Sequence, residues 1–261
     1  MKGIVLAGGA GTRLSPRTKI VSKQLLPVYD KPLIYYSLSV LMLANIRKIL
    51  IICSPSQIES FKKLLSNGAE IGIELSYAVQ EAPRGIAESF IIAENFLQGS
   101  RSALILGDNI FHGPGLGRKL ETFNEIEGAQ IFGYRVQNPQ PYGVATVDAA
   151  GDVVNLEEKP LNSISNIAIP GLYFFDGEAP KYAKYIMPSA RGELEILDLL
   201  KFYQNSGRLK LEILPRGTAW FDSGTFRDLH DASSYVRLME ERTGEHVGDP
   251  FEVAQNQGWI K

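Results

Sequence analysis

The sequence has few of the features on which several classes of protein depend. It contains one cysteine, Cys53, and three histidines, so it cannot form an internal disulfide and has no Cys/His cluster of the kind that binds zinc. No apolar run approaches the ~20 residues that a membrane-spanning helix needs. The formal net charge of -2 gives no indication of nucleic-acid binding. We therefore expect neither a membrane nor a nucleic acid as a partner.

The N-terminus also lacks the pattern of a secretory signal, because glycines at positions 8, 9 and 11 interrupt its apolar run. We read the protein as cytoplasmic and Cys53, in the apolar run KILIIC, as a buried strand residue. The 261 residues, 44% of them hydrophobic, suffice for one large domain or two small ones.

Apolar runs and helical periodicities alternate in the first half of the chain. Strands are predicted over 2–7, 48–53, 73–80 and 102–108, and helices over 32–46, 56–65 and 85–97. This alternation is typical of a mainly parallel α/β sheet covered by helices on both faces.

The second half is more mixed and begins near 110–128. Strands are predicted over 129–136, 142–148, 167–176 and 209–214, and helices over 178–186, 193–205 and from Thr225 to about Thr243. The acids of SARGELEIL (189–197) are expected on the surface of the second of these helices or in domain packing. We find no repeats or long linkers and expect one composite domain.

A glycine-rich turn, Gly8-Gly9-Ala10-Gly11, follows the first strand. Ligands of open α/β sheets bind beyond the carboxyl ends of the strands, and glycines let backbone amides approach phosphate oxygens closely. The spacing matches neither a P-loop, which needs a lysine that is absent here, nor the dinucleotide fingerprint, whose third glycine would be Leu14. A plain strand–helix turn remains the alternative.

Two cations favour a functional interpretation of this turn. Arg13 lies in the loop and Lys23 ten residues later. Each alone would suit a solvated surface, but together with the glycines they suit a polyphosphate whose charge must be held.

Two aspartates at predicted strand ends are candidate magnesium ligands. Asp108 follows LILG, and Asp222 follows AWF far along the chain. A carboxylate beside a phosphate site is a natural ligand of Mg²⁺. Capping of a turn or helix remains the alternative for both residues.

The motifs taken together resemble those of the sugar-1-phosphate nucleotidylyltransferases. The segments that show this resemblance are LAGGAGTRL (6–14), SKQLLPV (22–28), DKP (30–32), QEAPRGIA (80–87), LGDNIF (106–111), YGV (142–144), EEKP (157–160), GLYF (171–174), SARGELEI (189–196) and WFDSGT (220–225). The set is most similar to the branch of this family that transfers a thymidylyl group to a sugar phosphate.

The resemblance implies a Rossmann-like three-layer α/β/α fold with a mixed, mainly parallel central sheet. It implies a catalytic domain over 1–235, with a nucleotide-binding half at about 1–110 and a sugar-binding half at about 129–225, and a C-terminal helical end over 236–261. The implied substrates are dTTP and glucose 1-phosphate, with pyrophosphate as a product, Mg²⁺ as the cofactor and a homo-oligomer, a dimer or a tetramer, as the assembly.

The resemblance also implies roles for individual residues. Arg13 and Lys23 would be catalytic, and Asp108 and Asp222 would hold Mg²⁺. The implied nucleotide-binding residues are Leu6, Gly8, Gly9, Gly11, Thr12, Arg13, Gln24, Gln80, Gly85 and Asp108. The implied sugar-phosphate residues are Asn109, Gly143, Glu158, Lys159, Ile169 and Tyr173.

Base recognition is expected at Gln80, on a strand placed next to the first strand, because its amide can donate to and accept from a pyrimidine edge. At Gly85, expected to open the next helix, a side chain would block the base. Ile169 would contact the sugar through its backbone, and Trp220 would lie near the site or in the core. Arg84 and Pro170 depart from the residues expected of the family, which leaves the preference for dTTP over UTP open.

Alternatives stay open at this point. A sibling enzyme could use UTP, CTP or another sugar phosphate, and a regulatory subunit of the same fold would bind sugar nucleotides without turnover. Longer relatives continue for about thirty residues associated with a regulatory nucleotide site, so we expect a short form with weak or absent feedback inhibition.

Overall fold

The computed structural model describes residues 1–9 and 11–261. Ala10, in the middle of the glycine-rich turn, lies outside the described residues. In the part of the chain that is described, no helix combines the length and the apolar character needed to cross a membrane.

The elements follow the predicted alternation closely. The strands are β1 Lys2–Ala7, β2 Pro27–Val28, β3 Lys31–Pro32, β4 Lys48–Cys53, β5 Glu74–Val79, β6 Ser102–Leu106, β7 Ile110–His112, β8 Ala129–Arg135, β9 Gly143–Val147, β10 Val153–Glu158, β11 Ile167–Ala168, β12 Leu172–Phe175, β13 Leu209–Ile213 and β14 Ala219–Phe221. The helices are α1 Leu33–Leu43, α2 Ile58–Leu65, α3 Glu88–Ile92, α4 Glu94–Leu97, α5 Leu116–Glu121, α6 Ala179–Ala183, α7 Ile196–Asn205, α8 Phe226–Thr243 and α9 Pro250–Asn256.

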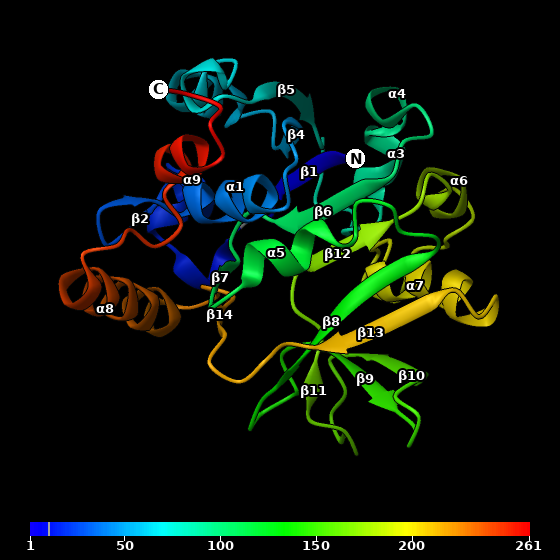
Figure 1. The fold of residues 1–261 in the computed structure, drawn as a ribbon. Helices are drawn as coiled ribbons and strands as arrows, with labels where there is room; N and C mark the ends of the chain where they lie inside the picture. Colours follow the sequence, from blue (N-terminus) through cyan, green and yellow to red (C-terminus); the bar gives the residue numbers. More distant parts are fainter. Residues whose placement is uncertain (10) are drawn as a thin grey trace.

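Ten strands form one mixed sheet in the order β10-β9-β11-β8-β12-β6-β1-β4-β5, with β13 paired to β8. The strands β6, β1, β4 and β5 are parallel to one another, as are β8 and β13. The strand β12 runs antiparallel between β6 and β8 and so joins the two halves of the sheet. Figure 1 shows β9, β10 and β11 gathered at the end of the sheet away from β5.

Helices cover both faces of the sheet, as the side chains of β1 show. Val5 and Ala7 belong to the cluster that packs against α1, α2, α5 and α9, whereas Ile4 and Leu6 belong to the cluster that packs against α3, α4, α6 and α7. Successive strand residues point to opposite faces, so two apolar layers result from one continuous apolar run. The three-layer α/β/α architecture with a mixed sheet is therefore confirmed.

Several element boundaries differ from the sequence prediction. The helix predicted over 85–97 begins at Glu88 and is divided into α3 and α4. The strand predicted over 167–176 is two strands, because the chain passes through Pro170 and Gly171 between its pairing with β9 and its pairing with β6. The strand β10 was not predicted, since half of its residues are polar.

The segment after β13 brings the last site residues to the sheet. The strand β14 pairs with β7, which places Trp220 opposite Phe111. The helix α8 then begins with a capping box in which the Thr225 side chain and Asp228 satisfy each other's backbone N–H groups. The start of this helix agrees with the sequence prediction.

Candidate active site

Three adjoining cavities lie where β1, β5 and β6 end. The first and third share Gly8, Gly9 and Gln80, and the first and second share Asp108. Their volumes are about 190, 170 and 270 Å³, so each is smaller than the roughly 300–1,000 Å³ of a typical small-molecule site. Together they provide a ligand site of ordinary size, and we call the junction of the first and second cavities at Asp108 the bend.

The first cavity collects most of the residues expected to bind the nucleotide. Its wall contains Leu6, Gly8, Gly9, Gln24, Gln80, Gly85 and Asp108, together with Pro83, Ile86, Leu106 and Glu193. Residues from β1, from the segment after β5 and from the end of β6 thus meet, although they are far apart in the sequence. The expected adjacency of β5 and β1 is wrong, because β4 lies between them.

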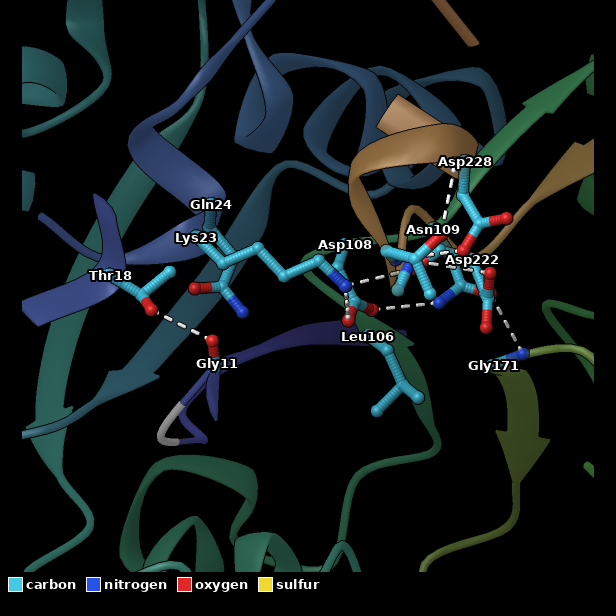
Figure 2. A network of polar contacts seen from close by, with 12 residues as sticks. Gly11, Thr18, Lys23, Gln24, Leu106, Asp108, Asn109, Gly171, Asp222 and Asp228 are labelled. Atoms are coloured by element: carbon cyan, nitrogen blue, oxygen red, sulfur yellow. Dashed lines mark hydrogen bonds and ion pairs between the residues drawn. The ribbon is translucent and has the colours of Figure 1, made fainter. Parts of the chain in front are cut away.

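The third cavity is the more cationic one and borders the glycine-rich turn. It is lined by Gly8, Gly9, Lys19, Lys23, Thr18, Gln80 and by serines and Gln57 from the region before α2. The Thr18 hydroxyl donates to the carbonyl oxygen of Gly11 at 2.7 Å, as Figure 2 shows, and a Cβ on Gly11 would collide with Thr18. Gly11 also has a φ of 54°, which favours glycine.

The second cavity contains every residue expected to bind the sugar phosphate. Asn109, Gly143, Glu158, Lys159, Ile169 and Tyr173 line it, with Asp108, Asp222 and Arg13 at the same cavity. Lys159 has a φ of 46°, an uncommon conformation for a lysine, and its ammonium lies 3.4 Å from Glu158 Oε1. The strained backbone presents this charged pair to the cavity.

Lys23 connects the acids at the bend between the cavities. Its Nζ donates to Asp108 Oδ2 at 2.7 Å and to the backbone carbonyl oxygen of Asp222 at 3.0 Å (Figure 2). Only 8% of the lysine is exposed. The two aspartates predicted from distant strand ends are therefore brought together on one buried ammonium.

Asp222 lies in an environment that disfavours its charged form. Burial raises the pKa of its carboxyl group, and the negative charges of Asp108 and Asp228 raise it further. Two nearby carboxylates that repel each other in a low-dielectric site fit a divalent cation, and oxygen ligands are those that Mg²⁺ prefers. Asp108 and Asp222 thus fit the magnesium ions expected from the sequence.

Asn109 connects Asp108 with two later segments. Its Nδ2 donates to Asp108 Oδ1 at 2.8 Å, while its Oδ1 accepts from Trp220 Nε1 at 2.7 Å and from the backbone N–H of Gly171 at 3.1 Å. The side chain is buried. Because three hydrogen bonds hold it, Asn109 fixes the direction of the Asp108 carboxylate.

Gln80 reaches the first cavity from the end of β5. Its Nε2 donates to the carbonyl oxygen of Gly85 at 3.1 Å and to Glu88 Oε2 at 2.8 Å. A Cβ added to Gly8 would lie 2.7 Å from Gln80 Oε1, so the amide oxygen occupies the space beside Gly8. A side chain at position 8 would therefore have to displace this amide from its place.

The need for glycine at position 85 has a cause within the protein itself, whether or not a base is bound. Gly85 has a φ of 103°, and a Cβ there would lie 2.3 Å from the backbone oxygen and 2.5 Å from the backbone nitrogen of Leu194. The neighbouring segments are joined by hydrogen bonds from Leu194 N–H to Arg84 and from Ala87 N–H to Leu194. The clash is with the protein backbone, and it exists before any base is bound.

Three of the residues expected to bind the nucleotide, Gly11, Thr12 and Arg13, do not line the first cavity. Arg13 lines the second cavity, and its guanidinium lies against Gly224, where a Cβ would meet it at 3.0 Å. Gly11 and Thr12 form the turn and the short helix before Arg13. Ile169 lines the second cavity, and its backbone N–H donates to the carbonyl oxygen of Gly143 at 2.8 Å.

The acids of 189–197 were placed wrongly on a helix surface, because α7 begins only at Ile196. Glu193 lines the first cavity, and Glu195 is buried in an ion pair with Arg191. The same guanidinium donates to Glu158 Oε1 at 3.1 Å, so this loop contacts a residue of the second cavity as well. Trp220 and Tyr142 also line the second cavity, and burial raises the pKa of Tyr142 to about 12.

A second group of potential metal ligands lies away from these cavities. Asp30, Glu240 and His246 place one ligand atom each within 4.8 Å of one another. The Lys31 ammonium is bound there, at 2.6 Å from Asp30 and 3.0 Å from Glu240. The lysine supplies the positive charge, so this group is an ion-pair cluster.

Comparison with known proteins places the chain among its relatives. A family model described as nucleotidyl transferase matches residues 2–237. The chain is 52% identical over 260 residues to the glucose-1-phosphate thymidylyltransferase of Mycobacterium tuberculosis (strain ATCC 25618 / H37Rv), covering 100% of this chain and 90% of the relative. It is 53% identical over 260 residues to that of Xanthomonas campestris pv. campestris (strain B100), covering 99% and 88%.

Solved structures agree with this result. A Bacillus anthracis chain described as a glucose-1-phosphate thymidylyltransferase in complex with sucrose is 36% identical, with a TM-score of 0.86 over 97% of this chain and 99% of that one. A UDP-glucose pyrophosphorylase complexed with UDP-glucose shares the fold at 22% identity, with a TM-score of 0.81 over 91% and 98%. The chain belongs to the nucleotidyl transferase family and, within it, to the glucose-1-phosphate thymidylyltransferases.

Proposed function

We propose that the protein transfers the thymidylyl group of dTTP to α-D-glucose 1-phosphate and thereby makes dTDP-glucose and pyrophosphate. The observation that supports this most directly is the position of Lys23, Asp108 and Asp222 at the bend between two cavities. The bend is where a nucleotide in the first and third cavities and a sugar phosphate in the second would meet. The names of the relatives give the substrates.

In this proposal an oxygen of the sugar phosphate attacks the α-phosphorus of dTTP. A new P–O bond forms there, and the bond to the pyrophosphate oxygen breaks on the opposite side. A phosphate monoester is already an anionic nucleophile, so the residues contribute position and charge rather than a strong base. The half over 1–110 would hold the nucleotide and the half over 129–225 the sugar.

Each group in the site has a role in the proposal. Lys23 would exchange Asp108 for an oxygen of the α-phosphate, where negative charge develops. Lys159 would bind the phosphate of the sugar substrate, and Glu158 would accept hydrogen bonds from sugar hydroxyls. Arg13 would hold the departing pyrophosphate. Its guanidinium lines the second cavity, so it would have to move past the bend toward the nucleotide.

Asp108 and Asp222 would hold Mg²⁺ in this proposal. The bound metal would reduce the repulsion between the two phosphates that react. Asn109, held by Trp220 and Gly171, would keep the Asp108 carboxylate turned toward the metal. A homo-oligomer, a dimer or a tetramer, belongs to the same proposal, and light scattering of the purified protein tests it.

The deciding experiment is pyrophosphate release with Mg²⁺ and glucose 1-phosphate, run in parallel with dTTP, UTP, CTP, ATP and GTP. We expect the highest rate with dTTP and a fall of roughly 10²–10³ in the Asp108→Asn variant. Asp198→Asn is the matched control, since it neutralises an aspartate that pairs with Lys201 on the surface of α7.

The other outcomes each change the conclusion. The highest rate with another nucleotide would keep the proposed chemistry and replace the proposed substrate. Nucleotide binding without any release of pyrophosphate would favour a regulatory subunit of the same fold.

A further inference from the structure

We propose that Glu88, held by Arg84, is a positioning residue that fixes the amide of Gln80 so that the first cavity selects a pyrimidine carrying a hydrogen on ring N3. The inference rests on the proposed function, because it concerns the base of the nucleotide in that reaction. It concerns residues that do not themselves touch the reacting phosphates.

Two protein groups contact the amide nitrogen of Gln80. One is the carbonyl oxygen of Gly85 at 3.1 Å, and the other is Glu88 Oε2 at 2.8 Å. Both are acceptors, so the end of the amide that faces them must be the NH₂ group. Both of its N–H donors are then used within the protein.

The opposite end of the same amide faces the ligand space. Gln80 Oε1 lies beside Gly8, where a Cβ would approach it to 2.7 Å, and both residues line the first cavity. Only 5% of Gln80 is exposed, so water competes little for this oxygen. The amide therefore presents an acceptor to the ligand and keeps its donors away from it.

Arg84 holds the carboxylate that determines this orientation. Its Nε and one terminal nitrogen both lie 2.8 Å from Glu88 Oε1, which leaves Oε2 for Gln80. The Glu88 side chain is 9% exposed and the Arg84 side chain 60%, so the arginine brings a charge from the surface to a buried partner. The two contacts from the guanidinium hold the Glu88 carboxylate in its direction.

The orientation has a chemical consequence for the base. Thymine and uracil carry a hydrogen on N3 and can donate it to Gln80 Oε1, whereas N3 of cytosine is an acceptor. Two acceptors that face each other in a buried site repel and leave both groups unsatisfied. The geometry thus selects thymine and uracil against cytosine and does not itself separate thymine from uracil.

The test measures the dissociation constants of dTTP and dCTP without glucose 1-phosphate, for the full chain and for Glu88→Gln. The new amide can turn its own NH₂ toward Gln80, which then loses its fixed direction. We expect the wild type to favour dTTP and the variant to lose roughly tenfold of that preference, the effect of one hydrogen bond to a charged group. Affinity for glucose 1-phosphate should stay unchanged.

The controls separate positioning from general damage. Glu94→Gln removes an exposed carboxylate of the neighbouring helix α4, which pairs with Lys184 after α6, and it should leave the preference as in the wild type. Arg84→Met leaves Glu88 in place but removes the group that holds it. It should lower the preference for dTTP over dCTP by less than Glu88→Gln does. If Glu88→Gln does not fold, the Arg84→Met result alone tests the inference.

Two results would overturn the inference. One is a wild type that binds dCTP as tightly as dTTP, and the other is a folded Glu88→Gln variant with the wild-type preference. Pyrophosphate release with glucose 1-phosphate tests the proposed function separately. A protein that prefers dTTP in binding and yet releases no pyrophosphate would refute that function and leave this inference standing.

Discussion

Replacing Gly85 by alanine tests whether the glycine serves the protein backbone or the base. An added Cβ at position 85 would lie 2.3 Å from the backbone oxygen of Leu194, which is closer than two non-bonded atoms can approach. The segment must then move away from Leu194 and lose two backbone hydrogen bonds, or stay and deform. The damage is expected in the protein without any ligand.

The size of the effect follows from two contributions. A left-handed conformation costs an alanine about 1–2 kcal/mol, and overpacking of a well-packed contact costs about 1–3 kcal/mol more. Gly85→Ala should therefore lower the free energy of unfolding by about 3 kcal/mol. For a protein of this size that corresponds to a fall of roughly 6–12 °C in the melting temperature.

Gly99→Ala is the matched control. Gly99 also has a positive φ, of 72°, but a Cβ there would meet no atom of the described residues within 4 Å. It should lose only the conformational contribution of about 1–2 kcal/mol. Urea unfolding of both variants without nucleotide gives the comparison, and equal stabilities would refute the explanation from Leu194.

Three further predictions follow from buried charges and from the single cysteine. Asp222→Asn should reduce pyrophosphate release by roughly 10²–10³ without lowering the stability in urea, because it removes a carboxylate that burial disfavours; a large loss of stability would contradict this. Burial raises the pKa of the Cys53 thiol to about 11, so the thiol stays protonated until the pH nears that value. A disulfide reagent at pH 8 should label it at least about 100-fold more slowly than in the urea-unfolded chain. Lys31→Met should cost about 3 kcal/mol in urea unfolding, because Glu240 is left buried without its ammonium partner; an unchanged midpoint would show that the ion pair is not needed.

The fold was predictable where a local sequence pattern covers a whole element or marks its end. β1 and β4 are continuous apolar runs between turn residues, and the capping residue Thr225 marks the start of α8, so sequence and structure agree there. Strand β10 was not predicted, because only one of its residues is buried and its extended conformation depends on pairing with β9. The division of the predicted strand over 167–176 had a local signal in Pro170 and Gly171, since proline interrupts a strand. The neighbour with which each part pairs has no such signal in the sequence.

The site was predictable as a set of motifs and much less as a geometry. The resemblance brought Gly8, Gln80 and Asp108 to one cavity correctly. It could not show that Gly85 is confined by Leu194, a residue more than a hundred positions later. Glu193 was missed for the same reason, since its position at the cavity follows from the loop before α7. Contacts between distant segments leave no period or spacing in the sequence.

The two contacts of Lys23 also determine when, during synthesis of the chain, the site can form. The lysine meets a carboxylate 85 positions later and a carbonyl oxygen 199 positions later. On a ribosome, which delivers the chain from its N-terminus, Lys23 emerges 199 residues before the Asp222 carbonyl oxygen. Until that second partner arrives the ammonium has only part of its final environment. The site is therefore incomplete until Asp222 has been made, although the turn that opens the site is made much earlier.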